Sequence, residues 1–321
     1  MRKLLLILAV SLIPVVVYCW GFFGHKSINR VAVYTLPTEL AGFYKQHIEY
    51  VTSHAVDPDM RRYAVKEEAP RHYIDIDHYG ENPFDNVPRK WEEAVEKFSE
   101  DTLQAYGIVP WHVERMYFRL VSAFKKKDIP YILKTSADIG HYIADAHVPL
   151  HTTENYNGQL TNQKGIHGFW ESRLPELYAD DYDFFVGKAH KIDDPLNFIW
   201  DEVQKSNAAV DSVLHFERDL TAEYPSDRKY AFEEKGATMM KTYSRDFSNE
   251  YHLMLDGMVE RRMRSAIIAV GSFWYSAWVE AGKPDLNTPL TAEQELQLEQ
   301  DRKELEAQYS SNKILGREHE D

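Results

Sequence analysis

The chain has 321 residues, of which 44% are hydrophobic and 13% aromatic, and this composition excludes a disordered chain. The length is sufficient for one large domain or two small ones, each with a buried core. The formal net charge of −14 repels polyanions and anionic surfaces at long range, so a phosphate-bearing ligand needs a local positive centre in the fold.

Residues 1–19 have the pattern of a secretory signal peptide. A basic start precedes an apolar run that is short for a membrane span, and we expect cleavage before Trp20. A retained membrane anchor and lipidation of Cys19 are the alternatives, although the bulky Tyr18 fits lipid processing poorly. Cys19 is the only cysteine, so no disulfide can form within the mature chain. We expect the mature protein to be secreted or periplasmic.

Apolar residues recur at spacings of three and four through most of the mature chain, which predicts amphipathic or buried helices. The predicted helices cover residues 28–51, 91–107, 109–128, 129–147, 198–216 and 262–282. The apolar stretch 263–281, ended by Gly282 and Pro284, is expected at the centre of the bundle. Signals for β-strands are nearly absent, and no repeat or Gly/Ser-rich linker divides the chain. We therefore expect an all-α, single-domain helical bundle over residues 20–290.

Three segments depart from this helical pattern. Residues 53–90, rich in Asp, Pro and His, and residues 152–169 are both longer than a connection between helices usually is, which indicates a functional role. Residues 291–321 are charged and carry little apolar surface. We expect this C-terminal segment to form a solvated helix that frays into a disordered tail.

Histidine and carboxylate residues gather in the segment DIGHYIADAHVPLH, residues 138–151. His141 and Asp145 are four residues apart, so they project from one face of a helix, where both can reach one metal ion. Pro149 ends that helix, and the following turn can bring His151 back toward the same place.

A second pair with the same spacing, His167 and Glu171, follows in the chain. Two such pairs are harder to explain by chance than one, although a polar seam between helices is the alternative interpretation. Further upstream, the candidate ligands are His25, Asp57, Asp59 and His72. Zinc favours imidazole and carboxylate ligands, and the lack of cysteine in the mature sequence excludes a cysteine-based structural site.

In this order and spacing, the candidate ligands resemble those of the zinc-dependent phospholipase C and single-strand-specific nuclease superfamily, whose members are helical enzymes with three zinc ions. The resemblance rests on Trp20-x4-His25, an Asp before the sequence HYIDID, His141-x3-Asp145-x5-His151 and His167-x3-Glu171. It covers residues 20 to about 175 by motif.

The resemblance implies three zinc sites. The first would use the free amino group and carbonyl oxygen of Trp20 together with His25 and Asp145. The second would use Asp57, His72, His141 and the same bridging Asp145, and the third would use His151, His167 and Glu171. An α-amino group has a pKa of about 7.7 to 8.0, so zinc can displace its proton at little cost, but only after the signal is cleaved.

The upstream carboxylate of the second site has two candidates. Asp57 has the family's usual separation from His72, whereas Asp59 matches the family's Asp-x-x-Arg pattern through Arg62. Because Pro58 lies between the two carboxylates, only one of them can easily point inward. We favour Asp57 as the ligand.

The resemblance also implies a hydrolytic function. Two zinc ions bridged by Asp145 would lower the pKa of a shared water toward ~7, and Asp57 would help to position that water for attack on a phosphodiester. We therefore expect a secreted zinc-dependent phosphodiesterase that binds a phosphodiester substrate, needs no stable protein partner and is a monomer.

Three functions fit this pattern. Glu171 as the last ligand and the lack of a basic insertion before it favour a phospholipase C. The second candidate is a single-strand-specific nuclease or 3'-nucleotidase, whose bases could stack on Tyr63, Tyr79, Tyr156 or Phe169. A non-catalytic helical protein that binds zinc for stability is the alternative of another class. It would use closed four-ligand sites, whereas the third site implied here has only three protein ligands.

Overall fold

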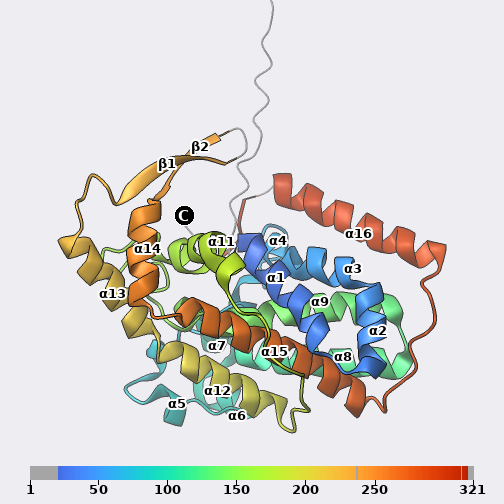
Figure 1. The fold of residues 1–321 in the computed structure, drawn as a ribbon. Helices are drawn as coiled ribbons and strands as arrows, with labels where there is room; N and C mark the ends of the chain where they lie inside the picture. Colours follow the sequence, from blue (N-terminus) through green and yellow to red (C-terminus); the bar gives the residue numbers. More distant parts are fainter. Residues whose placement is uncertain (1–20, 236–237, 312, 317–321) are drawn as a thin grey trace, which may run out of the picture.

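The computed structural model describes residues 21–235, 238–311 and 313–316. These residues form a helical bundle with one small two-stranded sheet (Figure 1). The all-α fold expected from the sequence is confirmed. The predicted signal peptide, residues 1–19, and the predicted ligand Trp20 lie outside the described residues.

All regular secondary structure in the first half of the described chain is helical. Its elements are α1 (Gly21–Ala32), η1 (Val33–Thr35), α2 (Thr38–Gln46), α3 (Ile48–Ser53), η2 (His54–Val56), α4 (Asp57–Arg61), η3 (Ala69–Arg71), η4 (Ile76–Tyr79), α5 (Pro83–Asn86), α6 (Trp91–Phe98), α7 (Glu100–Tyr106), α8 (Val109–Lys126) and α9 (Ile129–Ala146).

The second half adds more helices and a hairpin of two antiparallel strands. Its elements are η5 (Pro149–Thr152), α10 (Ile166–Gly168), the π-helical turn η6 (Phe169–Arg173), α11 (Leu174–Tyr178), η7 (Ala179–Asp181), α12 (Pro195–Asn207), α13 (Val210–Glu223), β1 (Tyr230–Lys235), β2 (Thr238–Tyr243), α14 (Arg245–Met254), α15 (Met258–Glu280) and α16 (Ala292–Ser311).

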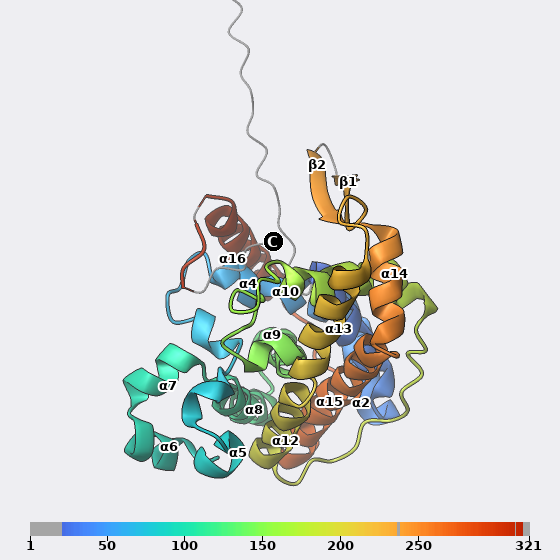
Figure 2. The same ribbon diagram turned by 90° about the vertical axis from the view of Figure 1, so that its left-hand side faces the viewer.

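Helix α9 lies at the centre of the bundle (Figure 2), and it contacts α1, α3, α8, α12 and α15. Nearly all of its residues are buried, including polar ones, so it presents no solvent face along most of its length. Helix α15 contacts it through Trp274, whose indole N–H donates to the Ser136 carbonyl at 3.0 Å and whose ring stacks on Tyr44. The polar residues of α9 are therefore buried in the interior of the bundle.

The structure divides three of the predicted helices. The helix predicted over 28–51 is interrupted at Pro37, which is extended with ψ 155°, and again at His47. The helix predicted over 91–107 is broken at Ser99, whose φ of 70° ends α6 and whose hydroxyl caps α7. The third break lies between α12 and α13. In each case the apolar periodicity continues across the break, which is why periodicity alone missed it.

The β1–β2 hairpin was not predicted from the sequence. Tyr230 pairs with Tyr243, and Phe232 with Lys241, so apolar and charged residues share a face and the alternation is weak. The hairpin projects beyond the helices above α14 (Figure 1). Its base is anchored by Tyr243, whose ring stacks on Phe169 at 3.8 Å.

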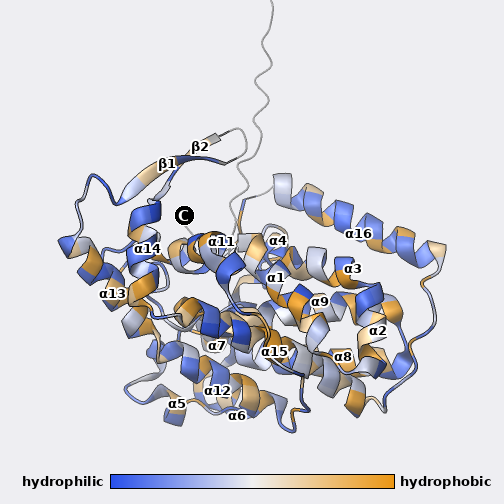
Figure 3. Cartoon of the chain, in the orientation of Figure 1, coloured by the Kyte–Doolittle hydropathy of each residue, from blue (hydrophilic) through white to orange (hydrophobic). Residues whose placement is uncertain are grey.

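The C-terminal segment forms the helix α16, which lies against α4. Figure 3 shows that hydrophilic residues predominate along this helix, and Leu298 is its one buried residue among those described. The disordered tail predicted at the end of the chain falls partly on 317–321, which lie outside the described residues. Within the described part of the chain, no helix has the length and apolar character needed to cross a bilayer.

Candidate metal centre

A glycine allows α1 to approach α9 closely. A Cβ atom at Gly140 would lie 2.1 Å from the side-chain oxygen of Asn29, so only glycine fits at this crossing. The Asn29 amide donates to the carbonyl of Val51 and to that of Ala137, both at 3.1 Å, which fixes α1 on α9. This close packing carries His25 of α1 to the buried face of α9.

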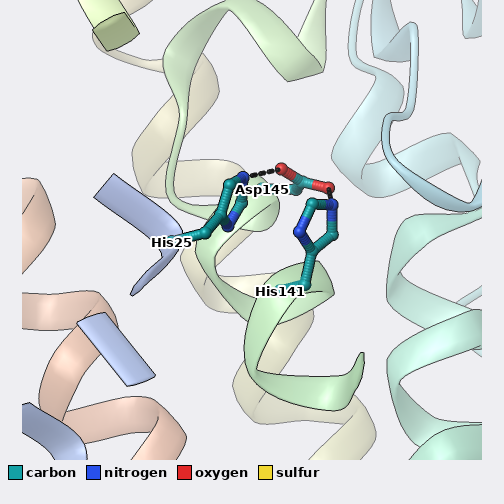
Figure 4. A group of neighbouring side chains, drawn as sticks. All are labelled: His25, His141 and Asp145. Atoms are coloured by element: carbon teal, nitrogen blue, oxygen red, sulfur yellow. Dashed lines mark ion pairs between the residues drawn. The ribbon is translucent and has the colours of Figure 1, made fainter. Parts of the chain in front are cut away.

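The first cluster consists of His25, His141 and Asp145 (Figure 4). His25 Nε2 lies 3.5 Å from Asp145 Oδ1, and His141 Nε2 lies 3.2 Å from Asp145 Oδ2. The two imidazole rings stack with their centroids 3.8 Å apart. All three side chains are at most 2% exposed, so these donors face one another away from bulk solvent.

The second cluster shares His141 with the first and adds Asp59 and His72. Asp59 Oδ1 lies 3.6 Å from His141 Nε2 and 3.7 Å from His72 Nδ1. His72 Nδ1 also lies 2.9 Å from Asp145 Oδ2. The other Asp59 oxygen is buried and has no hydrogen-bond partner within the described residues. Buried carboxylate oxygens normally have a partner, so this atom is suited to bind a cation.

The preference for Asp57 as a ligand is not supported by this geometry. Asp57 Oδ2 instead lies 2.7 Å from His54 Nδ1, and its Oδ1 accepts a hydrogen bond from Arg302 of α16. Residues two apart on a helix point about 200° apart around its axis, so Asp57 faces outward when Asp59 faces His72. Asp59 therefore takes the place that the sequence analysis assigned to Asp57.

The third cluster consists of His151, His167 and Glu171. Glu171 Oε1 lies 3.0 Å from His167 Nε2, and Glu171 Oε2 lies 3.3 Å from His151 Nε2. Glu171 lies in the π-helical turn η6, and single π turns occur frequently at functional sites because they redirect a side chain. Both pairs with four-residue spacing thus meet within clusters.

Backbone carbonyls orient three of the histidines. The Nδ1 atoms lie 2.9 Å from the Ala55 oxygen for His141, 2.6 Å from the His72 oxygen for His151, and 3.1 Å from the Tyr156 oxygen for His167. A carbonyl can only accept, so each Nδ1 carries a proton and each Nε2 is the ring nitrogen left to bind a metal ion. This is the second layer of hydrogen bonds that metal-binding histidines need.

The ring of His72 has the opposite orientation to those of the other three histidines. Its Nδ1 faces the cluster, while its Nε2 lies 3.6 Å from the buried carboxylate of Glu68. Glu68 is held in turn by Arg71 and by the hydroxyl of Tyr142. The sequence analysis missed Glu68, although it precedes His72 by the same four residues that link the two pairs it identified.

The charges of the clusters are strongly coupled. Burial alone would raise the pKa of Asp145, but His141 and His151 hold it well below its usual range. Burial would lower the pKa of His141, but Asp145 and Asp59 raise it to about 9. Burial and the neighbouring His141 hold the pKa of His25 well below its ordinary value. Without a bound cation, His141 is therefore protonated at neutral pH.

This pKa leads to a testable expectation for metal binding. Because the folded-state pKa of His141 is raised from 6.5 to about 9, a proton competes with the metal at every pH below that value. We expect zinc binding at about pH 7 to release at least one proton, and the apparent affinity to rise about tenfold per pH unit up to about pH 9. Calorimetry in buffers of different ionisation enthalpy measures this release. An affinity that is constant between about pH 6 and pH 8 contradicts the expectation.

The donor set of the three clusters fits zinc. Within each cluster the candidate ligand atoms all lie within 4.8 Å of one another, and all the residues are buried. The donors are imidazole nitrogens and carboxylate oxygens, which zinc prefers when thiolates are absent. Of the nine residues predicted as ligands, seven lie in these clusters, Asp57 does not, and Trp20 lies outside the described residues.

Comparison with known proteins agrees with this geometry. A family model described as zinc-dependent phospholipase C matches residues 24–234, which is more than half of the chain. The matched range contains all three clusters, from His25 to Glu171. A comparison with curated proteins found no match. With its helical fold and zinc-compatible clusters inside the matched range, the chain belongs to the zinc-dependent phospholipase C family.

Proposed function

We propose that the mature protein is a secreted phosphodiesterase with three zinc ions, one in each cluster, and that it cleaves the head-group diester of a phospholipid. The observation that carries this proposal is the position of Asp145. Its Oδ1 faces His25 and, at 3.8 Å, His151 Nδ1, while its Oδ2 faces His72 and His141. One carboxylate thus connects the first two clusters and can bridge two cations.

Each residue has a distinct role in this proposal. When bound, zinc lowers the pKa of water to about 7 and offsets negative charge on the phosphate. Asp145 and Asp59 would supply the carboxylate ligands of the first two clusters, and Glu171 and His167 would bind the zinc ion of the third. Arg62 is buried beside Asp59 and offers a further positive charge for the phosphate. Burial raises the pKa of Asp59, and the positive charges around it, including Arg62, oppose that rise.

Cleavage of the signal before Trp20 is part of the proposal. Gly21, the next residue, donates its backbone N–H to the hydroxyl of Ser172 at 3.1 Å. Ser172 directly follows Glu171 in η6, so the start of α1 lies beside the ligand clusters. An amino group freed at Trp20 would be one residue from this position. Mass spectrometry of the secreted protein tests whether the mature chain begins there.

The aromatic residues favour a phospholipid over a single-stranded nucleic acid. Phe169 and Tyr79, two of the four suggested base-stacking residues, are buried at 2% and 5% exposure and cannot receive a base. Tyr63 packs edge-on against Tyr309. A net charge of −14 also opposes the approach of a polyanion. These features and the family match support the phospholipase activity.

The test compares substrates with the zinc-loaded mature protein. We expect release of phosphocholine from phosphatidylcholine vesicles and hydrolysis of bis-p-nitrophenyl phosphate, both abolished by a chelator and restored by zinc. Single-stranded RNA and DNA should remain intact under the same conditions. Release of nucleotides without phosphocholine would assign the nuclease activity instead. Bound zinc without hydrolysis of any of these substrates would support the non-catalytic alternative.

A further inference from the structure

Helix α4, which carries Asp59, has little stability of its own. It spans only Asp57–Arg61, and a single helical turn is unstable in isolation because few backbone hydrogen bonds repay the ordering of its residues. Its side chains nevertheless place Asp59 Oδ1 within 3.7 Å of two histidine nitrogens. Other parts of the protein must therefore hold α4 in position.

The C-terminal segment contacts α4 at both of its ends. We call α16 and residues 313–316 the C-terminal clamp. At the start of α4, the Arg302 guanidinium donates to Asp57. At the end of α4, the backbone N–H of Leu315 donates to the Arg62 carbonyl at 2.7 Å, and the Tyr309 ring packs edge-on against Tyr63 at 4.7 Å. The clamp thus spans the whole of α4.

Both partners of the contact between Arg302 and Asp57 make further interactions that restrict their side chains. Asp57 also accepts from His54, whose ring stacks on Tyr50 at 3.9 Å. Arg302 also lies 2.7 Å from Glu306 on its own helix and 3.4 Å from the carbonyl of Ser53. The side chains of Asp57 and Arg302 are 11% and 21% exposed, so water screens their interaction only in part.

Helix α16 buries few of its own residues against the bundle. Two open pockets of about 310 and 380 Å³ lie beside Arg302; α3 borders both, and α4 borders the first. Leu298 is the one residue of α16 that is buried among those described. Polar contacts therefore carry much of the attachment, and weakening one of them should leave the core of the bundle folded.

We propose that Arg302, through Asp57, is a positioning residue for the metal ligand Asp59. Asp57 and Asp59 lie on opposite sides of one helical turn, so a clamp that fixes the orientation of Asp57 also fixes that of Asp59. The inference rests on the metal-binding role of the cluster formed by Asp59, His72 and His141. It assigns to Asp57 a role that is distinct from metal binding.

The experiment measures zinc binding by the full mature protein and the variants Arg302→Ala, Arg302→Lys and Lys134→Ala. Lys134→Ala is the matched control, because it removes an ion pair that Lys134 makes with Asp301 of α16 at 3.6 Å and leaves the contact between Arg302 and Asp57 in place. We expect Arg302→Ala to lower the affinity for one zinc ion, that of the cluster with Asp59, by about tenfold. Competition with a chelator measures this affinity. The other ions should bind as in the wild type. Arg302→Lys should recover part of the loss, and Lys134→Ala should bind zinc normally.

A second measurement does not depend on zinc. Amide hydrogen exchange at residues 59–63 of the metal-free protein should be faster in Arg302→Ala than in the wild type or in Lys134→Ala. Equal zinc affinity and equal exchange in Arg302→Ala and the wild type would overturn the inference. An equal loss of all bound ions would also overturn it, because only the cluster with Asp59 should respond. A wild-type protein that binds no zinc would instead refute the proposed function.

Discussion

Replacement of Asp145 by Asn is expected to remove zinc from two clusters and to lower the rate of phosphodiester hydrolysis by at least about 10³-fold. The substitution keeps the shape of the side chain but removes the charge that faces the histidines of the first and second clusters at 2.9 to 3.5 Å. Zinc per chain, measured by atomic emission after dialysis, should fall together with the rate for bis-p-nitrophenyl phosphate.

The matched control for this variant is Asp193→Asn. Asp193 is also an aspartate, but its side chain is 87% exposed and contacts only a surface lysine among the interactions found for it. We expect this control to keep full zinc content and full activity. If Asp145→Asn kept both as well, the bridging role of this carboxylate would be refuted.

Replacement of Gly140 by Ala should have the largest effect on stability. The new Cβ would lie 2.1 Å from the Asn29 side-chain oxygen, so the Asn29 side chain must move. Its amide nitrogen would then give up the hydrogen bonds that it donates to the carbonyls of Val51 and Ala137. Overpacking of this kind costs about 3 kcal/mol, so urea unfolding should show a loss of that size. Because α1 also carries His25, the affinity for the zinc ion of the first cluster should fall too.

Gly42 provides the matched control, because it is also a helical glycine. It is exposed in α2, and a Cβ atom there would meet nothing within 4 Å. Gly42→Ala should therefore stabilise the protein by about 0.5 to 1 kcal/mol, since alanine loses less backbone entropy on folding. Equal effects of the two substitutions would show that the crossing of α1 and α9 is not tightly packed.

Some of the site was readable from local spacing. His141 and Asp145, and likewise His167 and Glu171, are four residues apart, and a helix places such residues on one face whatever surrounds it. The long helices α8, α9 and α15 were predicted close to their observed bounds. These features depend on interactions between residues that are near one another in the chain.

The choice between Asp57 and Asp59 as the metal ligand depends instead on contacts between residues far apart in the sequence. Their separation from His72 could not decide between them, because the path of the chain between residues 59 and 72 is set by packing. One of the two partners of Asp57, Arg302, lies 245 residues away in the sequence, and no local pattern predicts such a contact. The charged C-terminal segment, expected to be solvated, supplies that partner.

By itself, the sequence determined the helical class of the fold, the chemical identity of the donors and the two pairs that share a helix face. Hydrophobic periodicity and four-residue spacing are local properties, so they can be recognised without knowledge of the rest of the fold. Only the tertiary structure decided which donors meet, because Gly140, the carbonyl acceptors and the C-terminal clamp act across long separations in sequence. Those contacts arise from close packing, which a one-dimensional pattern does not encode.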